Sequence, residues 1–136
     1  MRIAEIYIAA PDFDYMDTTH IDTVAKSLTY HNFTPRLPVR ENGQMGDDDS
    51  IERKKGLFDA DMAILGQCQL LLAVMLNNDP GTLIEIGLAA AKGIPVLVYD
   101  PHRIAKNLML TELPALVSSD LDEIVAKVFD LASRLV

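Results

Sequence analysis

The sequence predicts an α/β protein built on a parallel sheet, and three observations lead to this class. Apolar runs rich in Ile, Val and Leu recur along the chain, as in RIAEIYIA, LLLAVML and IPVLVYD. Between them lie longer segments in which apolar residues recur every three or four positions, the spacing of an amphipathic helix. The run LLLAVML is apolar on both faces, which is typical of a strand covered by helices on both sides.

The first half of the chain alternates strand and helix signals. A strand is predicted over 2–9 and a helix over 17–31, where apolar residues follow helical spacing. A short strand at 34–39 contains two prolines, which lack the N–H of a central strand and favour an edge position. The polar segment 40–50 is predicted to be a loop, and its last residue, Ser50, is placed to cap the next helix.

The second half continues the same alternation. A helix is predicted over 51–67, a central strand over 70–76, a helix over 82–92 that Gly93 ends, and a strand over 94–100. A loop with a short helix follows, then a minor fifth strand at 114–118. A final amphipathic helix begins near Ser119 and Asp120, either of which suits its N-cap.

Right-handed crossovers between such elements give one doubly wound domain over residues 1–136. We expect a flavodoxin-like or Rossmann-like parallel sheet of four to five strands with helices on both faces. Ligands bind such sheets at the carboxyl ends of the strands. Functional side chains are therefore expected in four loops, around residues 9–15, 39–49, 77–82 and 100–109.

Composition excludes several classes of function. A net charge of −8 and a pI near 4.7 argue against nucleic-acid binding, because phosphates require a basic surface. The single cysteine, Cys68, permits no disulfide or cysteine-based zinc site within one chain. The start of the chain does not resemble a signal peptide, and no apolar run reaches membrane-spanning length. We expect a cytoplasmic protein that binds small molecules, with no membrane partner.

Glu85 is the most informative polar residue, because it stands among apolar neighbours near a helix start. Thr82 and Glu85 match a capping box, in which the glutamate only reaches back to the helix N-terminus. Alternatively, the helix dipole and the exclusion of water by Leu83, Ile84 and Ile86 make Glu85 a candidate nucleophile at the end of a central strand. Both interpretations fit the sequence.

The segment DPGTLIEIGLAAAKGIPVLVYD resembles the signature of the nucleoside 2-deoxyribosyltransferases. Three further pieces resemble that family in the same order: IYIAAPDF, DADMAILGQCQLLLAV and KNLML. The resemblance implies that Glu85 attacks the anomeric carbon of a 2′-deoxynucleoside, and that a second nucleobase resolves the ester. It also implies that Asp61, or Asp59 two residues earlier, meets the leaving base, and that Tyr7 orients Glu85.

The same resemblance suggests five substrate-binding residues. Phe13 corresponds to an aromatic residue that stacks on the base, and Asp79 and Asn107 to groups that hold the sugar hydroxyls. Gln44 corresponds to a glutamine that meets the 3′-hydroxyl. Asn107 and Met109 lie in the segment that a neighbouring subunit lends to the site, which implies a homo-oligomer, from dimer to hexamer.

We therefore expect a transferase of nucleotide salvage that exchanges nucleobases on 2′-deoxyribonucleosides through a deoxyribosyl-glutamate intermediate. No GxGxxG or GxxxxGK[ST] motif and no metal-ligand spacing occurs, and the reaction as expected needs no cofactor or metal. Its partners would be nucleosides and free nucleobases. Two alternatives stay open: a hydrolase of 2′-deoxynucleosides or their 5′-monophosphates, and a non-catalytic nucleoside- or nucleotide-binding module in which Glu85 is only a helix cap.

Overall fold

The computed structural model describes residues 4–135 and contains one five-stranded, all-parallel sheet with the strand order β2-β1-β3-β4-β5. The strands are β1 (Glu5–Ala9), β2 (Thr34–Arg36), β3 (Leu70–Val74), β4 (Val96–Tyr99) and β5 (Leu116–Ser118). The helices are α1 (Thr19–Tyr30), α2 (Pro38–Asn42), α3 (Ile51–Gln67), α4 (Pro80–Ala91), α5 (Leu108–Glu112) and α6 (Leu121–Leu135). This topology confirms the predicted doubly wound α/β class.

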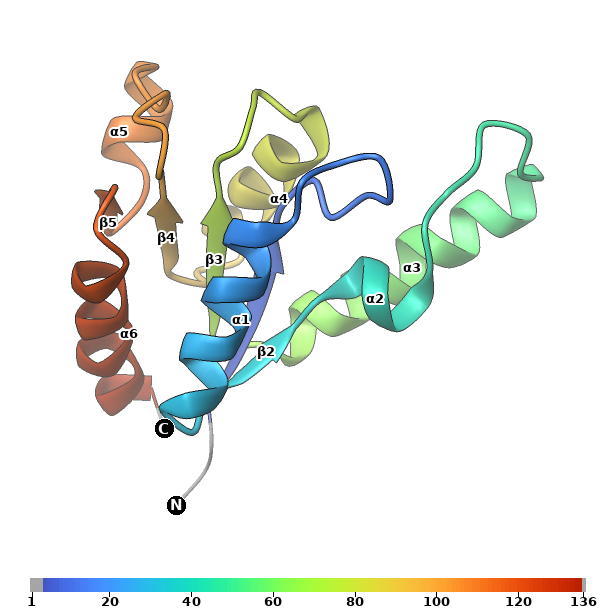
Figure 1. Ribbon diagram of the computed structural model, residues 1–136. Coiled ribbons are helices and arrows are strands. Elements are labelled where there is room, and N and C mark those ends of the chain that lie inside the picture. The colour runs from blue at the N-terminus through green and yellow to red at the C-terminus, as the bar shows by residue number, and fades with distance from the viewer. Residues whose placement is uncertain (1–3, 136) are drawn as a thin grey trace.

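Helices cover both faces of the sheet (Figure 1). On one face, α1 and α6 pack on the side chains of Ile6 and Ile8, and on the other α3 and α4 pack on Tyr7 and Ala9. Successive side chains of β1 therefore enter opposite layers, as the pleat of a strand requires. Every residue of β3 is buried, which confirms its predicted central position.

Tyr7 owes its direction to this alternation. It pairs in register with Leu71 of β3, so its ring lies in the layer between the sheet and α3 and α4, and its side chain is 0% exposed. The hydroxyl of this tyrosine must therefore find a partner on one of these two helices, because a buried phenol without a hydrogen bond is costly.

Two predicted boundaries were wrong, and in both cases a proline begins a helix. The strand predicted over 34–39 ends at Arg36, and residues 38–42 form α2, with Pro38 at the first helical position. Likewise, α4 begins at Pro80 rather than Thr82, with Asp79 as its N-cap. Proline is suited to the first helical turn because its fixed φ matches the helix and its missing N–H would have no partner there.

The remaining elements agree with the predictions. Ser50 caps α3 by accepting a hydrogen bond from Arg53 N at 3.1 Å. Gly93 follows α4 with a φ of 75°, a conformation in which glycine is unstrained. β2 lies at one edge of the sheet and β5 at the other, and residues 2–3 of the predicted first strand lie outside the described part.

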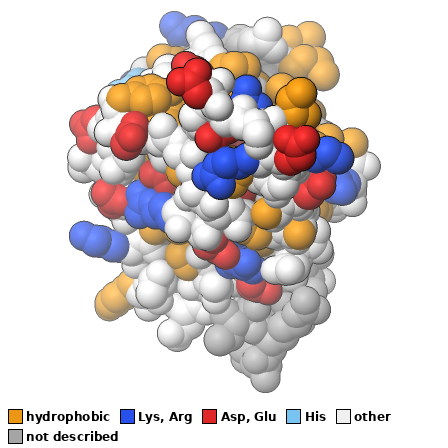
Figure 2. Space-filling model, turned by 90° about the vertical axis from the view of Figure 1, so that its right-hand side faces the viewer, with side chains coloured by type: hydrophobic (Ala, Val, Ile, Leu, Met, Phe, Trp, Pro, Cys, Tyr) orange, Lys and Arg blue, Asp and Glu red, His pale blue; other side chains and the backbone are white. Residues whose placement is uncertain are grey.

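The surface carries charges of both signs. On the side of the molecule that faces the viewer in Figure 2, Lys and Arg side chains alternate with Asp and Glu and gather into no basic patch. The first half of α3 stands clear of the sheet (Figure 1), and residues 51–56 are exposed. None of the described helices is both long enough and apolar enough to span a membrane.

Candidate active site

Glu85 and Tyr7 form the centre of the site. Glu85 lies in the second turn of α4, and its Oε2 accepts a hydrogen bond from the hydroxyl of Tyr7 on β1. The capping-box interpretation is wrong, because Thr82 donates its backbone N–H to Asp79 Oδ2 at 2.9 Å. Asp79 is thus the N-cap, and Glu85 is free to meet the sheet instead of the helix end.

Burial sets the protonation of this pair. Loss of solvent raises the pKa of Glu85 to about 7, the Tyr7 hydroxyl opposes this rise, and the negative charges of Asp61 and Asp79 add to it. Burial, followed by the charge of Glu85, also raises the pKa of Tyr7 far above its usual range. Tyr7 therefore stays a proton-bearing donor, while Glu85 changes its charge close to neutral pH.

A second carboxyl group faces the same space from α3. Asp61 is half-buried, and desolvation raises the pKa of its side chain. The amide Nδ2 of Asn42, at the end of α2, donates to Asp61 Oδ1 at 2.9 Å and lowers that pKa. Two carboxyl groups in one site, each harder to ionise than an exposed one, suit acid–base and nucleophilic chemistry.

These groups line a cavity of about 300 Å³, which we call the carboxylate cavity. Its polar side chains are three carboxylates, and its remaining walls are apolar. Phe58 and Ile84 lie at its rim, where they are 56% and 62% exposed. The lining residues are Ala10, Phe13, Pro38, Val39, Phe58, Asp61, Met62, Asp79, Gly81, Ile84, Glu85 and Leu88. Such walls suit a planar ring that places its faces against the apolar side chains and its polar edge toward the carboxylates.

The structure brings together five of the predicted site residues: Tyr7, Phe13, Asp61, Asp79 and Glu85. The ring of Phe13 stacks on Tyr15 with centroids 5.4 Å apart.

Two other predicted residues lie outside this cavity. Gln44 accepts a hydrogen bond from Asp14 N at 2.9 Å, so it holds the loop that carries Phe13. Asp59, the alternative to Asp61, is exposed and forms an ion pair with Lys55 at 3.7 Å. Its position on the outer side of α3 favours Asp61 as the residue that meets the substrate.

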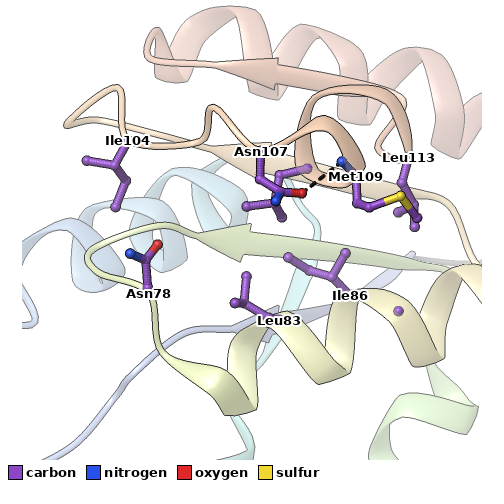
Figure 3. A pocket seen from close by; sticks show the side chains of 9 residues that line it. Asn78, Leu83, Ile86, Ile104, Asn107, Met109 and Leu113 are labelled. Carbon is purple, nitrogen blue, oxygen red and sulfur yellow. Dashed lines mark hydrogen bonds between the residues drawn. The ribbon is translucent and has the colours of Figure 1, made fainter.

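Asn107 and Met109 lie on the other side of α4. They line a cavity of about 630 Å³, which we call the apolar cavity (Figure 3). Leu83 and Ile86 of α4 form its opposite wall. Asn107 Oδ1 accepts a hydrogen bond from Met109 N at 2.9 Å and so caps α5. Within one chain these two residues do not reach the carboxylate cavity.

Sequence reasoning missed Asn42 and most of the apolar wall. Phe58 and Met62 carried a usable signal, because Phe58 stands three residues before Asp61 and four before Met62, the two spacings that bring helical side chains together. Asn42 carried none, since its contact depends on how α2 packs against α3. In residues 4–135 no group of three or more His, Cys, Asp or Glu side chains is arranged to hold a metal ion.

Comparison with known proteins gives the family and the fold. A family model described as nucleoside 2-deoxyribosyltransferase matches residues 6–118. A solved 2-deoxyribosyltransferase from Bacillus psychrosaccharolyticus is similar, at 24% identity and a TM-score of 0.79, over 89% of this chain and 90% of that one. A comparison of this sequence with curated proteins found no match.

Two further solved structures share the fold. A conserved protein from Enterococcus faecalis V583 has 24% identity and a TM-score of 0.73, over 98% of this chain and 100% of that one. The CMP N-glycosidase from Clostridium botulinum has 18% identity and a TM-score of 0.57, over 92% and 97% of the two chains.

Proposed function

The chain belongs to the nucleoside 2-deoxyribosyltransferase family, and we propose that it exchanges nucleobases on 2′-deoxyribonucleosides through a covalent ester on Glu85. The observation that carries this proposal is the hydrogen bond from buried Tyr7 to Glu85 beside a second carboxyl group, Asp61. A merely structural glutamate would be satisfied by the tyrosine hydroxyl and would gain nothing from a second carboxyl group beside it, because that group disfavours its charged form.

In the first step, a Glu85 oxygen forms a bond to C1′ while the bond from C1′ to the base nitrogen breaks. The electron pair of the broken bond stays with the base, and Asp61 supplies the proton or hydrogen bond that neutralises it. In the second step, an acceptor base attacks C1′, returns its proton to Asp61 and releases Glu85. The two displacements together retain the configuration at C1′.

Tyr7 fixes the orientation of the nucleophile. Its hydroxyl occupies Glu85 Oε2, which leaves Oε1 for the attack on C1′. The hydrogen bond also stabilises the charged form of Glu85 against the desolvation that raises its pKa to about 7. Because this pKa is near neutral, a large share of Glu85 is ionised under ordinary cellular conditions.

The substrate-binding residues follow from the walls of the site. Phe13 is suited to stack on the base, and Asp79 to accept a hydrogen bond from a sugar hydroxyl. Gln44 lies in the loop after α2 and holds the loop that carries Phe13. We propose that its side chain binds the 3′-hydroxyl. We propose that Asn107 and Met109 complete the site of a neighbouring subunit, which requires a homo-oligomer. The exchange of nucleobases would serve nucleotide salvage.

Hydrolysis of the same N-glycosidic bond is the second candidate, with water in place of the acceptor base. The structural likeness to a CMP N-glycosidase supports this alternative. The charged side chains that line the carboxylate cavity are all acidic, which disfavours a 5′-monophosphate and favours a nucleoside. A binding module without catalysis loses its main argument, because Asp79 and not Glu85 caps α4.

Chromatography of product mixtures tests the proposal. The protein is incubated with 2′-deoxyinosine and adenine, and separately with thymidine and adenine. We expect new 2′-deoxyadenosine with wild type and with Glu52→Ala, which removes an exposed carboxylate of α3, but none with Glu85→Ala. Free base without 2′-deoxyadenosine would indicate a hydrolase, and exchange that survives Glu85→Ala would refute the proposed nucleophile.

Mass spectrometry adds a direct test of the intermediate. Without an acceptor base, the protein should gain the mass of one deoxyribosyl group on the peptide that contains Glu85. Glu85→Gln should bind the nucleoside without forming this adduct, because an amide is a poor nucleophile. An adduct on another residue would overturn the assignment.

A further inference from the structure

Asn42 is the one described side chain that hydrogen-bonds Asp61. Its Nδ2 lies 2.9 Å from Asp61 Oδ1, and both residues are half-buried. The two belong to different elements, α2 and α3, which the loop 43–50 separates. The contact therefore exists only because α2 is held in a fixed place against α3.

Ion pairs of Arg40 fix the position of α2. Arg40, two residues before Asn42, binds Asp12 through both Nε (2.8 Å) and a terminal nitrogen (3.0 Å), and Asp22 at 2.6 Å. These bonds join α2 to the loop after β1 and to α1. Pro38 and Val39 of the same short helix line the carboxylate cavity. Asn42 therefore contacts Asp61 from a short helix whose position is fixed by these ion pairs.

The charges around Asp61 give this contact its importance. Glu85 on α4 and Tyr7 on β1 both have their pKa raised by the charge of Asp61, and Asp79 adds a further carboxylate at the start of α4. Among the described groups, Asn42 is the partner that favours an ionised Asp61. Without this amide, Asp61 would be left with burial and the neighbouring carboxylates, which both disfavour its charged form.

We propose that Asn42 is a positioning residue for base departure, which holds Oδ1 of Asp61 so that Oδ2 faces the base and carries the proton. This inference rests on the proposed transfer reaction. An amide N–H donates to the unprotonated oxygen of a carboxyl group, so the bond selects which oxygen bears hydrogen. As the C1′–N bond breaks, the proton passes from Oδ2 to the base, and the amide then stabilises the new Asp61 carboxylate.

A double-mutant cycle tests whether Asn42 acts through Asp61. Release of free base or new nucleoside is measured for wild type, Asn42→Ala, Asp61→Ala and the double variant. We expect Asn42→Ala to lower kcat about tenfold with KM changed less than about twofold, and to have no further effect in the Asp61→Ala background. An equal loss in both backgrounds would overturn the proposal.

Asn42→Leu separates the hydrogen bond from the shape of the side chain. It is close to asparagine in size and branching, and it removes the N–H donor without adding a charge. The proposal expects Asn42→Leu to lose activity as Asn42→Ala does, whereas activity close to wild type would mean that only shape matters and would refute it.

A carboxyl-carbon NMR titration of Asp61 gives a readout that does not depend on turnover. The pKa of Asp61 should rise in Asn42→Ala, because the donor that favours the charged form is gone. An unchanged pKa overturns the inference about Asn42. Failure of the transfer reaction itself would appear differently, as an inactive wild-type protein in which the pKa of Asp61 still responds to Asn42→Ala.

Discussion

Helix α4 separates two cavities that differ in size and in chemistry. On one side, Gly81, Glu85 and Leu88 line the carboxylate cavity of about 300 Å³. On the other, Leu83 and Ile86 line the apolar cavity of about 630 Å³. Helical spacing of three to four residues explains how neighbours in the sequence face opposite spaces. The reactive groups gather in the smaller cavity, so volume alone is a poor guide to the site.

The two cavities differ in the free-energy cost of burying their polar side chains. The polar residues of the apolar cavity are asparagines, whereas the carboxylate cavity contains Asp61, Asp79 and Glu85. Burying a carboxylate without a cation disfavours its charged form, and the pKa of Glu85 near 7 records that cost. The proposed function therefore depends on the side of α4 that is less favourable for stability.

Asp61→Asn should produce a large effect on the rate of base release. We expect base release to fall by about 10²–10⁴-fold, because an amide cannot supply the proton to the leaving base. Rates of nucleoside turnover under saturating substrate measure it. Asp59→Asn, at the exposed position two residues earlier, is the matched control and should keep full activity. The reverse order of effects would exchange the roles of the two aspartates.

Glu85→Gln should make the protein more stable at alkaline pH while abolishing transfer. The pKa of Glu85 is raised from 4.5 in the unfolded chain to about 7 in the fold, so its favourable contribution exists below about pH 4.5 and is lost as pH rises through 7. Above that pH, the ionised side chain costs the fold about 3 kcal/mol, from about 1.4 kcal/mol per pKa unit.

Denaturant unfolding of wild type and Glu85→Gln at pH 4 and pH 8 measures this difference. The stability gain of the variant should be close to zero at pH 4 and should reach its full value at pH 8. A gain that does not depend on pH would mean that burial does not control the ionisation of Glu85.

The sequence predicted these two sides of α4 unequally. Strand and helix positions were accessible because periodicity and burial act locally, and the family resemblance supplied Glu85, Asp61 and Tyr7. The start of α4 was misassigned because T-x-x-E was preferred over the Asp79-Pro80 pair, although both are helix-start signals. The hydrogen bond from Asn42 to Asp61 depends on tertiary packing, and no local sequence pattern predicts it.

Tyr7→Phe should produce a smaller effect that appears as a shift of pH dependence. The hydroxyl lowers the pKa of Glu85, so its removal should move that pKa above 7. For a shift of about one unit, the ionised share of Glu85 at pH 7 drops from about one half to about one tenth, so transfer should fall about fivefold and should recover partly at higher pH. The pH dependence of kcat/KM measures it. A uniform loss at all pH values would indicate that Tyr7 contributes in some way other than through the ionisation of Glu85.

Ile86→Val tests the opposite side of α4 and should have the smallest effect. Ile86 is 3% exposed and lines the apolar cavity next to Glu85 in sequence. Removal of one buried methylene should cost about 0.5–1.5 kcal/mol of unfolding free energy and leave the pH dependence of transfer unchanged. Denaturant unfolding and the pH profile are compared for the same preparation. If the profile moved as it does for Tyr7→Phe, the two sides of α4 would be coupled, and the division between a chemical side and a packing side would fail.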